Sequence, residues 1–424
     1  MEKSILVVDD EERIRESVRE ILSDEGYRVI EASNGVKALE LIRKERPNLV
    51  LLDIWMPQVD GIGLLKQIKD QEPRVNVIMI SGHGNIHTAV AATKLGAFDF
   101  IEKPLSLDGL LLTVRRALGE PPAAKPQRMS KPGKTRSRFR TEASTAAAKS
   151  LKQRTLKKSV VISGQGLHSG IKTGMILHPL PPNSGILFSG ISADATLPAH
   201  LDYVGSTGYA TSLRGKGIAV GTVEHFLAVL HSYLIGNLLV KVQGEIPIMD
   251  GSALEFCHLI EEAGIEEQEE EWSEIVIDRT YRVGVEGEES IRVEPADTFG
   301  VRYLLDYPKP VGTQEYTYIF TGPESFKEEI APARTFGFLK DIEKLEKMGL
   351  VNGGRLSNCI LIDNEKILNT ELRFGDEFAR HKILDIVGDF YLLGRPIRAM
   401  VTARMTGHSD NIALLHKIKK GMSL

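Results

Sequence analysis

A histidine and two aspartates follow one another at helical spacing late in the chain. His381, Asp385 and Asp389 occupy positions i, i+4 and i+8, so a helix over 377–389 would display them on one face. An imidazole and a carboxylate four residues apart can chelate one ion. With one further ligand from elsewhere they would make three, which leaves zinc an open position for catalysis. Taken alone, the pattern also fits a surface His–Asp pair on a solvated helix.

Glu224 and His225 form a second polar group, at the start of a predicted helix over 223–234. They lie in its first turn, away from the apolar stripe, and we expect Thr222 to cap the helix N-terminus. A glutamate in a first turn stabilises the helix dipole, and a nearby histidine is often only a surface residue. The pair therefore does not establish a site by itself.

Polar residues also stand at the ends of apolar runs in the first 120 residues: Asp9, Asp10, Asp53, Ser81 and Lys103. In a parallel sheet, functional groups gather beyond the carboxyl ends of the strands. Three carboxylates that converge there need a cation, and oxygen ligands suit Mg²⁺. With the ion bound, Asp53 can act as a nucleophile toward a phosphoryl group, whose oxygens Lys103 and Ser81 would hold.

The elements that would position this group alternate regularly. Five short apolar runs are each followed by an amphipathic stretch of helical period. The expected strands are 5–8, 28–30, 48–52, 76–80 and 98–101, and the expected helices are 14–22, 36–43, 63–69, 89–95 and 107–118. Five strand–helix units predict a doubly wound, parallel, five-stranded α/β domain with helices on both faces.

This segment resembles the response-regulator receiver family over residues 3–119. The matching motifs are VVDDE (7–11), LLDIWMP (51–57), SG (81–82) and KP (103–104). The resemblance implies that Asp53 is the phospho-acceptor and that a sensor histidine kinase is the phosphodonor. It assigns Mg²⁺ to Asp9, Asp10, Asp53 and the backbone carbonyl of Trp55. It places the conformational switch at Ser81, Phe100 and Lys103.

From residue 156 onward, predicted strands and helices mix without a strict βαβ rhythm, which indicates α+β layers. Six motifs here resemble the UDP-3-O-acyl-N-acetylglucosamine deacetylase family, zinc enzymes of lipid A synthesis. They are GQGLHSG (164–170), TVEHFLAVL (222–230), EIPIMDGSA (245–253), ARTFGF (333–338), LRFGDEFARHKILDIVGD (372–389) and GHSDN (407–411). The resemblance runs from 156 to about 418 and implies hydrolysis of the N-acetyl group of UDP-3-O-acyl-N-acetylglucosamine.

The resemblance also implies a role for each matching polar residue. His225, His381 and Asp385 would bind Zn²⁺, although ligands of this type also accept iron. Glu224 would take a proton from the attacking water, and His408 would protonate the leaving amine.

Four further roles follow from the same motifs. Asp389 would orient His408, and the Thr335 hydroxyl would stabilise the oxyanion. Lys382 would meet the UDP diphosphate, and Phe336 would position the sugar or nucleotide. For His168 and His258 we expect structural roles.

The motifs divide the chain into four parts: a receiver domain at 1–119, a basic linker at 120–155, and deacetylase subdomains at 156–272 and 273–424. The family folds as two similar α+β layered domains with the metal between them. An acidic cluster at 266–274 is a candidate boundary between the two. Residues 125–140 are rich in Lys and Arg and contain one aromatic residue, Phe139. They fit a solvated tether or a contact with an anionic surface better than base stacking, so we expect no nucleic acid partner.

Composition further limits the class of protein and its cellular compartment. Two cysteines, Cys257 and Cys359, exclude a disulfide framework and a Cys-only zinc site, and they favour a reducing compartment. A signal-peptide pattern and apolar runs of 18 residues are both absent from the sequence, so we expect a cytoplasmic protein with at most peripheral contact with the inner membrane surface.

Two other functions compete with a regulated deacetylase. A signalling protein could carry the deacetylase-like module as a sensing or interaction domain, but such a module should have lost Glu224, His408 or a metal ligand. A DNA-binding regulator is the third interpretation, and a helix-turn-helix pattern is missing after the linker.

Overall fold

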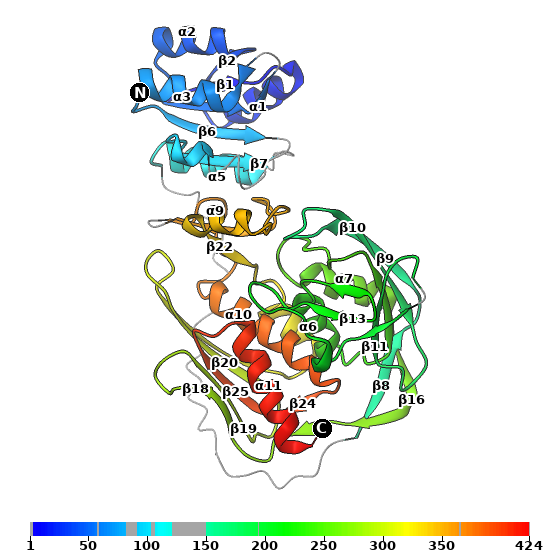
Figure 1. Cartoon of the computed structure of the whole chain (residues 1–424). Helices are drawn as coiled ribbons and strands as arrows, with labels where there is room; N and C mark the ends of the chain where they lie inside the picture. Colours follow the sequence, from blue (N-terminus) through cyan, green and yellow to red (C-terminus); the bar gives the residue numbers. More distant parts are fainter. Residues whose placement is uncertain are drawn as a thin grey trace. The chain divides into compact units, whose positions relative to one another are not determined.

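The computed structural model describes residues 3–56, 59–81, 91–102, 107–120, 150–193, 195–363 and 366–423. These residues form two compact units. The first contains the described residues up to 120, and the second contains most of those from 150 onward (Figure 1). Of the expected linker, residues 121–149 lie outside the described part of the chain.

The first unit is a parallel sheet with the strand order β2-β1-β3-β6-β7. Its strands are β1 (Ser4–Val8), β2 (Arg28–Ala32), β3 (Leu49–Asp53), β6 (Asn76–Ser81) and β7 (Asp99–Glu102). All five residues of β1 and of β3 are buried, as expected for strands covered on both faces. This confirms the predicted doubly wound fold and all five predicted strands to within two residues at each end.

Helices cover this sheet. Those with described bounds are α1 (Glu12–Asp24), α2 (Gly35–Glu45), α3 (Gly61–Gln71) and α5 (Leu107–Ala117), and a short hairpin of β4 (Trp55–Met56) and β5 (Val59–Asp60) follows β3. Of the predicted helix at 89–95, residues 91–94 are helical, and its start lies outside the described residues. Val18 of α1 and Leu110 and Val114 of α5 share one apolar cluster with Val7 and Leu51 of the central strands. One face of the sheet is therefore closed by α1 and α5.

Two five-stranded sheets and a layer of helices build the second unit. The first sheet has the order β12-β11-β15-β10-β9 and the second the order β18-β19-β25-β20-β21. The first comprises β9 (Val160–Gln165), β10 (Lys172–Pro179), β11 (Ile186–Ser189), β12 (Leu197–Pro198) and β15 (Leu238–Val242). The second comprises β18 (Tyr281–Gly284), β19 (Ser290–Glu294), β20 (Gly300–Asp306), β21 (Thr313–Ile319) and β25 (Met400–Arg404). These mixed sheets confirm the predicted α+β class.

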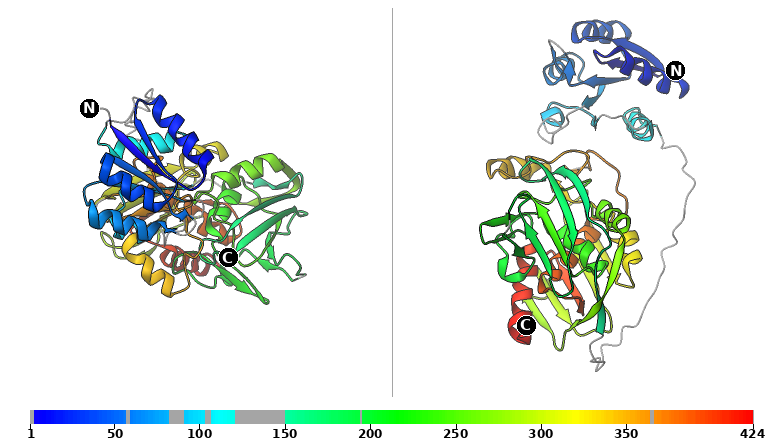
Figure 2. Two further views of the ribbon diagram at one scale, coloured as in Figure 1. Left: turned by 90° about the horizontal axis from the view of Figure 1, so that it is seen from above. Right: turned by 90° about the vertical axis from the view of Figure 1, so that its right-hand side faces the viewer.

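The main helices of this unit lie between the two sheets (Figures 1 and 2). They are α6 (Glu224–Ser232), α7 (Leu254–Ala263), α10 (Glu377–Phe390) and α11 (His408–Met422). Helices α10 and α11 pack on the second sheet, and α6 packs between α7 and α10. Every residue of α6 is buried.

Smaller elements complete the unit. They are β8 (Ser150–Leu156), β13 (Leu213–Gly215), β14 (Ile218–Val220), β16 (Ile265–Ser273), β17 (Ile275–Val276), β22 (Phe336–Phe338), β23 (Ile360–Ile362), β24 (Ile397–Arg398), α8 (Pro323–Glu329), α9 (Leu339–Lys347), η1 (Leu201–Tyr203) and η2 (Tyr391–Leu393). The acidic cluster at 266–274 largely forms β16, which pairs with the more basic β8. Among the described residues, none of the helices combines the length and apolar character needed to cross a bilayer.

Thr222 does not cap α6, so that prediction is wrong. Val223 is the residue before the helix, and its side chain makes no capping hydrogen bond. Thr222 has a left-handed backbone with φ of 56° and donates its hydroxyl hydrogen to Glu245 instead. The carboxylate of Glu245 also accepts hydrogen bonds from the backbone N–H groups of His168 and Ser169, so it ties this turn to the start of α6.

His231 is an unusual core residue in the last turn of α6. It is 2% exposed, and neither ring nitrogen has a hydrogen-bond partner among the described residues. Its ring packs edge-on against Phe299 and Tyr391, with centroids 4.9 and 5.3 Å away. Burial lowers the pKa of His231 from 6.5 to about 4.

We expect His231→Leu to stabilise the protein and to reduce its acid sensitivity. As the pH falls from 6.5 toward about 4, the unfolded chain binds a proton that folded His231 does not, so the wild type loses up to about 3 kcal/mol over this window. Leucine removes this loss and the unsatisfied nitrogens. Urea unfolding at about pH 7.5 and about pH 5 measures both effects. Equal acid sensitivity of the two proteins would contradict the prediction.

Candidate active site

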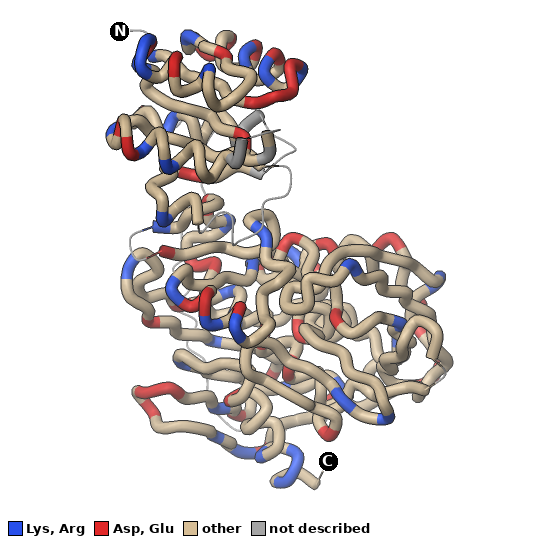
Figure 3. The backbone as a smooth tube through the Cα atoms, turned by 45° about the horizontal axis from the view of Figure 1, so that its top comes forward, with Lys and Arg blue, Asp and Glu red and all other residues tan. Residues whose placement is uncertain are grey.

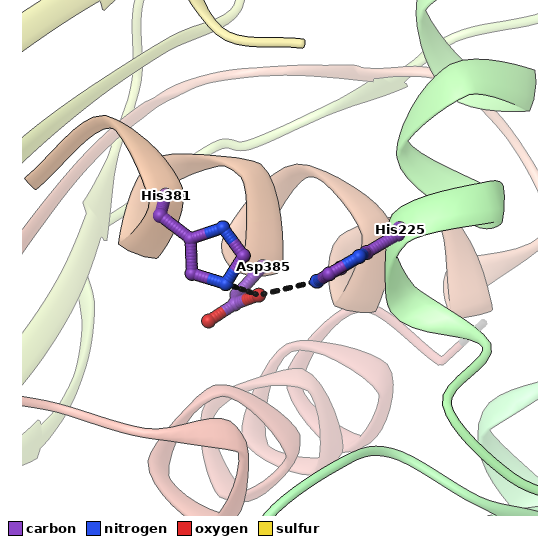
Figure 4. A group of neighbouring side chains, drawn as sticks. All are labelled: His225, His381 and Asp385. Carbon is purple, nitrogen blue, oxygen red and sulfur yellow. Dashed lines mark ion pairs between the residues drawn. The ribbon is translucent and has the colours of Figure 1, made fainter. Parts of the chain in front are cut away.

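Two buried helices cross closely enough to join residues that are far apart in the sequence. A Cβ atom at Gly388 of α10 would lie 2.0 Å from the carbonyl oxygen of Glu224 on α6, so the crossing needs a glycine at this position. The contact brings His225 of α6 opposite the face of α10 that carries His381 and Asp385 (Figure 4).

His225, His381 and Asp385 each offer a ligand atom, and these atoms lie within 4.8 Å of one another. Nε2 of His381 is 3.6 Å and Nε2 of His225 is 3.8 Å from Oδ1 of Asp385 (Figure 4). These distances are too long for hydrogen bonds but suit ligands arranged around one ion. The other ring nitrogen of His381 lies 3.1 Å from the carbonyl oxygen of Ala333, a contact that orients the ring.

The charge states of the three groups also fit a metal ion. Burial, and next the nearby His381, lower the pKa of His225 to about 3, and burial also lowers the pKa of His381. Burial opposes ionisation of Asp385, but Lys382 and then the histidines outweigh it and hold the pKa of Asp385 well below its usual range. Two neutral imidazoles and one carboxylate suit zinc or ferrous iron.

Glu224 and His408 face each other beside these three residues. Both line a cavity of about 420 Å³ that also contains His225, His381 and Asp385. Oε1 of Glu224 lies 3.8 Å from Nε2 of His408. Burial raises the pKa of Glu224 to about 8, and a divalent cation nearby would lower it again and favour the basic form.

Asp389 holds the other side of the His408 ring. Its Oδ2 atom lies 2.8 Å from Nδ1 of His408 and accepts a hydrogen bond of 2.8 Å from Asn411. Burial lowers the pKa of His408, but Asp389 and Asp385 outweigh this effect and raise it to about 9. A protonated His408 with Nε2 toward the cavity is placed to donate a proton there.

Thr335, Phe336 and Lys382 line the same cavity. The ammonium group of Lys382 is 2.9 Å from Oδ2 of Asp385. Phe336 belongs to an aromatic cluster with Tyr307 and Phe338, whose rings lie 5.4 to 6.4 Å apart. All nine residues expected at the deacetylase site are therefore brought together.

A buried ion pair fixes the segment that carries Thr335, directly before β22. Arg334 donates to Glu377 of α10 at 2.8 Å, and the side chain of Glu377 is fully buried. Glu377 also accepts hydrogen bonds from the backbone N–H groups of Arg334 and Arg373. The segment of Thr335 and the helix that carries His381 and Asp385 are thereby attached to each other.

The first unit carries the second expected site. Asp9, Asp10 and Asp53 offer ligand atoms within 4.8 Å of one another at the carboxyl ends of β1 and β3. Asp9 and Asp53 are buried and Asp10 is exposed. A Cβ atom at Gly61 would lie 2.5 Å from the carbonyl oxygen of Asp53, so the loop after β3 folds back over this residue only with a glycine there.

Of the three expected switch residues, two lie in the described part of the chain. Ser81 ends β6 beside β3 and is fully buried, and Phe100 in β7 is 8% exposed. Trp55 lies in β4, directly after the strand that carries Asp53, and Lys103 lies outside the described residues.

Residues 153–420 match the family model of UDP-3-O-acyl N-acetylglycosamine deacetylases, which is more than half of the chain. The chain belongs to this family. The UDP-3-O-acyl-N-acetylglucosamine deacetylase of Myxococcus xanthus is 44% identical over 273 residues, which cover 63% of this chain and 87% of that protein. Those of Nitratiruptor sp. and Coxiella burnetii are each 40% identical, and the matches cover 63% of this chain and 90% of each relative.

The first unit matches a different family model. Residues 5–115 match the response regulator receiver domain. The solved receiver domain of NtrX from Brucella abortus is 53% identical, with coverage of 27% of this chain and 98% of that chain and a TM-score of 0.27. The family model and the observed strand order confirm the predicted receiver domain.

Two residues of the deacetylase site were not predicted, Gly388 and Thr211. The sequence contains 39 glycines, and nothing local distinguishes the one that faces another helix. Thr211 lies in a polar stretch with turn composition, and its role depends on contacts with residues 13 and 178 positions away.

We expect Gly388→Ala to separate α6 from α10 and to weaken the metal site. The added methyl group would collide with the backbone at Glu224, so His225 would move away from Asp385. Bound metal per chain should fall well below that of the wild type, and the thermal midpoint should fall. Gly375→Ala is the matched control, because a Cβ atom there meets nothing within 4 Å. Full metal content in Gly388→Ala would contradict this view of the crossing.

Proposed function

We propose that the chain hydrolyses the N-acetyl group of UDP-3-O-acyl-N-acetylglucosamine and releases acetate and the free 2-amino sugar nucleotide. The observation that carries the proposal is the meeting of a metal-ligand triad, a buried glutamate and an Asp-supported histidine in one cavity of a chain that belongs to this family. The sensing alternative has no comparable support, because Glu224 and His408 are both present and face the cavity.

Zinc is the cofactor we propose for His225, His381 and Asp385. When bound, the ion supplies a Lewis acid that activates water and polarises the amide carbonyl. Nδ1 of His225 is buried and has no hydrogen-bond partner in the described part of the chain, so its ring is held by packing alone. Lys382 balances the charge of Asp385 and keeps this carboxylate ionised.

The chain's own residues would divide the proton transfers. Glu224 takes the proton of the attacking water, for which its burial beside the cavity suits it. His408 gives a proton to the leaving amine through Nε2, while Asp389 holds Nδ1. The Thr335 hydroxyl donates to the developing oxyanion.

The wall of the cavity suits the nucleotide part of the substrate. Lys382 presents a cation for the diphosphate, and one of its three hydrogens is already directed at Asp385. Phe336, Tyr307 and Phe338 offer ring faces for the sugar or the base.

Replacing Glu224 with Gln should strongly reduce catalysis while the metal site persists. The amide cannot accept the proton of water, so acetate release should fall by about 10²- to 10⁴-fold. Metal content should remain at the wild-type level, whereas His381→Ala should reduce it. The exposed Glu262→Gln serves as the control. Wild-type protein with bound zinc and no acetate release would refute the proposed function.

We further propose that phosphorylation of Asp53 regulates this activity, with Mg²⁺ held by Asp9, Asp10 and Asp53 and a sensor histidine kinase as phosphodonor. The proposal rests on the convergence of the three carboxylates in a receiver domain. The domain organisation that we propose is a receiver at 1–119, a linker at 120–155, and deacetylase subdomains at 156–272 and 273–424.

Acetyl phosphate with Mg²⁺ should phosphorylate the wild type and the exposed control Asp70→Asn but not Asp53→Asn. The amide introduced at position 53 would not provide the carboxylate nucleophile. Deacetylation measured before and after phosphorylation should then change in the wild type and the control but not in Asp53→Asn. Identical turnover of both wild-type forms would exclude regulation through this residue.

A further inference from the structure

A short loop carries Thr211 into the deacetylase cavity region. Residues 205–212 are closed by backbone hydrogen bonds between Gly205 and Ser212 at 2.8 Å and between Ser212 and Ser206 at 2.9 Å. The hydroxyl groups of Ser206 and Ser212 are also 2.9 Å apart. The loop is therefore braced at its base, and β13 begins directly after it.

Thr211 is fully buried and contacts the groups proposed as base and acid. Its backbone N–H donates to Oε2 of Glu224 at 3.0 Å. Its hydroxyl lies 2.6 Å from Oδ1 of Asp389 and 3.2 Å from Nδ1 of His408. One residue thus touches three members of the proposed proton-transfer machinery.

The direction of each hydrogen bond follows from the available hydrogens. A threonine hydroxyl has one hydrogen, and a carboxylate only accepts, so the short contact is a bond from Thr211 to Oδ1 of Asp389. This leaves Oδ2 of Asp389 for Nδ1–H of His408 and for Asn411. Both oxygens of Asp389 are then engaged, and its carboxylate plane is fixed.

The orientation of His408 depends on that plane. With Nδ1 on Asp389, Nε2 points toward Oε1 of Glu224 at 3.8 Å. The bond from the Thr211 N–H holds the other oxygen of Glu224, so Oε1 remains directed at the cavity side.

We propose that Thr211 is a positioning residue. It orients the proposed base Glu224 directly through its backbone N–H, and it orients the proposed acid His408 indirectly through Asp389. This inference rests on the proposed deacetylation. It does not require Thr211 to touch the substrate.

The inference is tested by measuring the deacetylation of UDP-3-O-acyl-N-acetylglucosamine by the full-length, zinc-loaded protein. Thr211→Val removes the hydroxyl but keeps the shape and the backbone N–H. We expect kcat to fall about 10- to 100-fold with KM within about twofold, as for other residues that orient a catalytic group. Thr211→Ser should restore most of kcat, and Thr211→Ala, which adds no bulk, should behave like the valine variant.

A double variant separates action through Asp389 from an independent effect. Thr211→Val added to Asp389→Asn should lower kcat no further than Asp389→Asn alone, because the hydroxyl acts on the group already lost. The control is Thr155→Val, which removes a buried hydroxyl that donates to the carbonyl of Asn237 at 2.5 Å. It should lower the thermal midpoint without changing kcat. Metal content and thermal midpoint are measured for every variant.

The outcomes separate the two proposals. An inactive zinc-loaded wild type overturns the deacetylase function and this role together. An active wild type with unchanged kcat in both Thr211→Val and Thr211→Ala, no rescue by serine, or a full additional loss in the double variant overturns the positioning role alone.

Discussion

The close crossing of α6 and α10 is the constraint on which the deacetylase site depends. Gly388 lets the backbone of α10 approach that of Glu224, and the same contact sets the distance between His225 and Asp385. Helix α6 contributes His225 and Glu224, the proposed metal ligand and base. Helix α10 contributes the two further proposed ligands, His381 and Asp385, together with Lys382 and Asp389. The two proposed functions of the cavity, ion binding and proton transfer, are therefore governed by one packing distance.

Burial of so many ionisable groups is costly, and the structure offsets this cost with pairing. Elsewhere in the second unit, charges of both signs follow the outer segments (Figure 3), as in the exposed pair Arg302–Glu315. Inside, Asp385 has Lys382 and Glu377 has Arg334. Removing one partner of a buried pair leaves an uncompensated charge and typically costs about 3–5 kcal/mol. Glu224 faces His408 at 3.8 Å, yet burial still raises its pKa to about 8, and a divalent ion would lower it again.

Spacing along the chain was enough to predict which carboxylates converge in the first unit and which imidazole and carboxylate pair on α10. Asp9 directly follows β1 and Asp53 ends the parallel neighbour β3, so the sheet itself brings them together. His381 and Asp385 share a helix face, so their pairing is local. The placement of His225 opposite them was predicted from the family resemblance. A local sequence pattern does not determine which two helices pack against each other. Thr222 was wrongly expected to cap α6. Threonine is favoured at helix N-caps, but the hydroxyl of Thr222 donates instead to Glu245, which is distant in the sequence.

Hydrogen bonds between residues far apart in the sequence anchor the irregular segments of the site. Glu245 ties the turn at His168 to the start of α6, and Glu377 ties the segment before β22, which carries Thr335, to α10. Thr211 ties its loop to Asp389. In each case a buried carboxylate on one segment accepts a hydrogen bond from a loop or turn, which satisfies polar groups that have no partner within their own segment. Supporting hydrogen bonds of this kind restrict the positions of loop residues, so the segments of the site that lack regular secondary structure are also held in place.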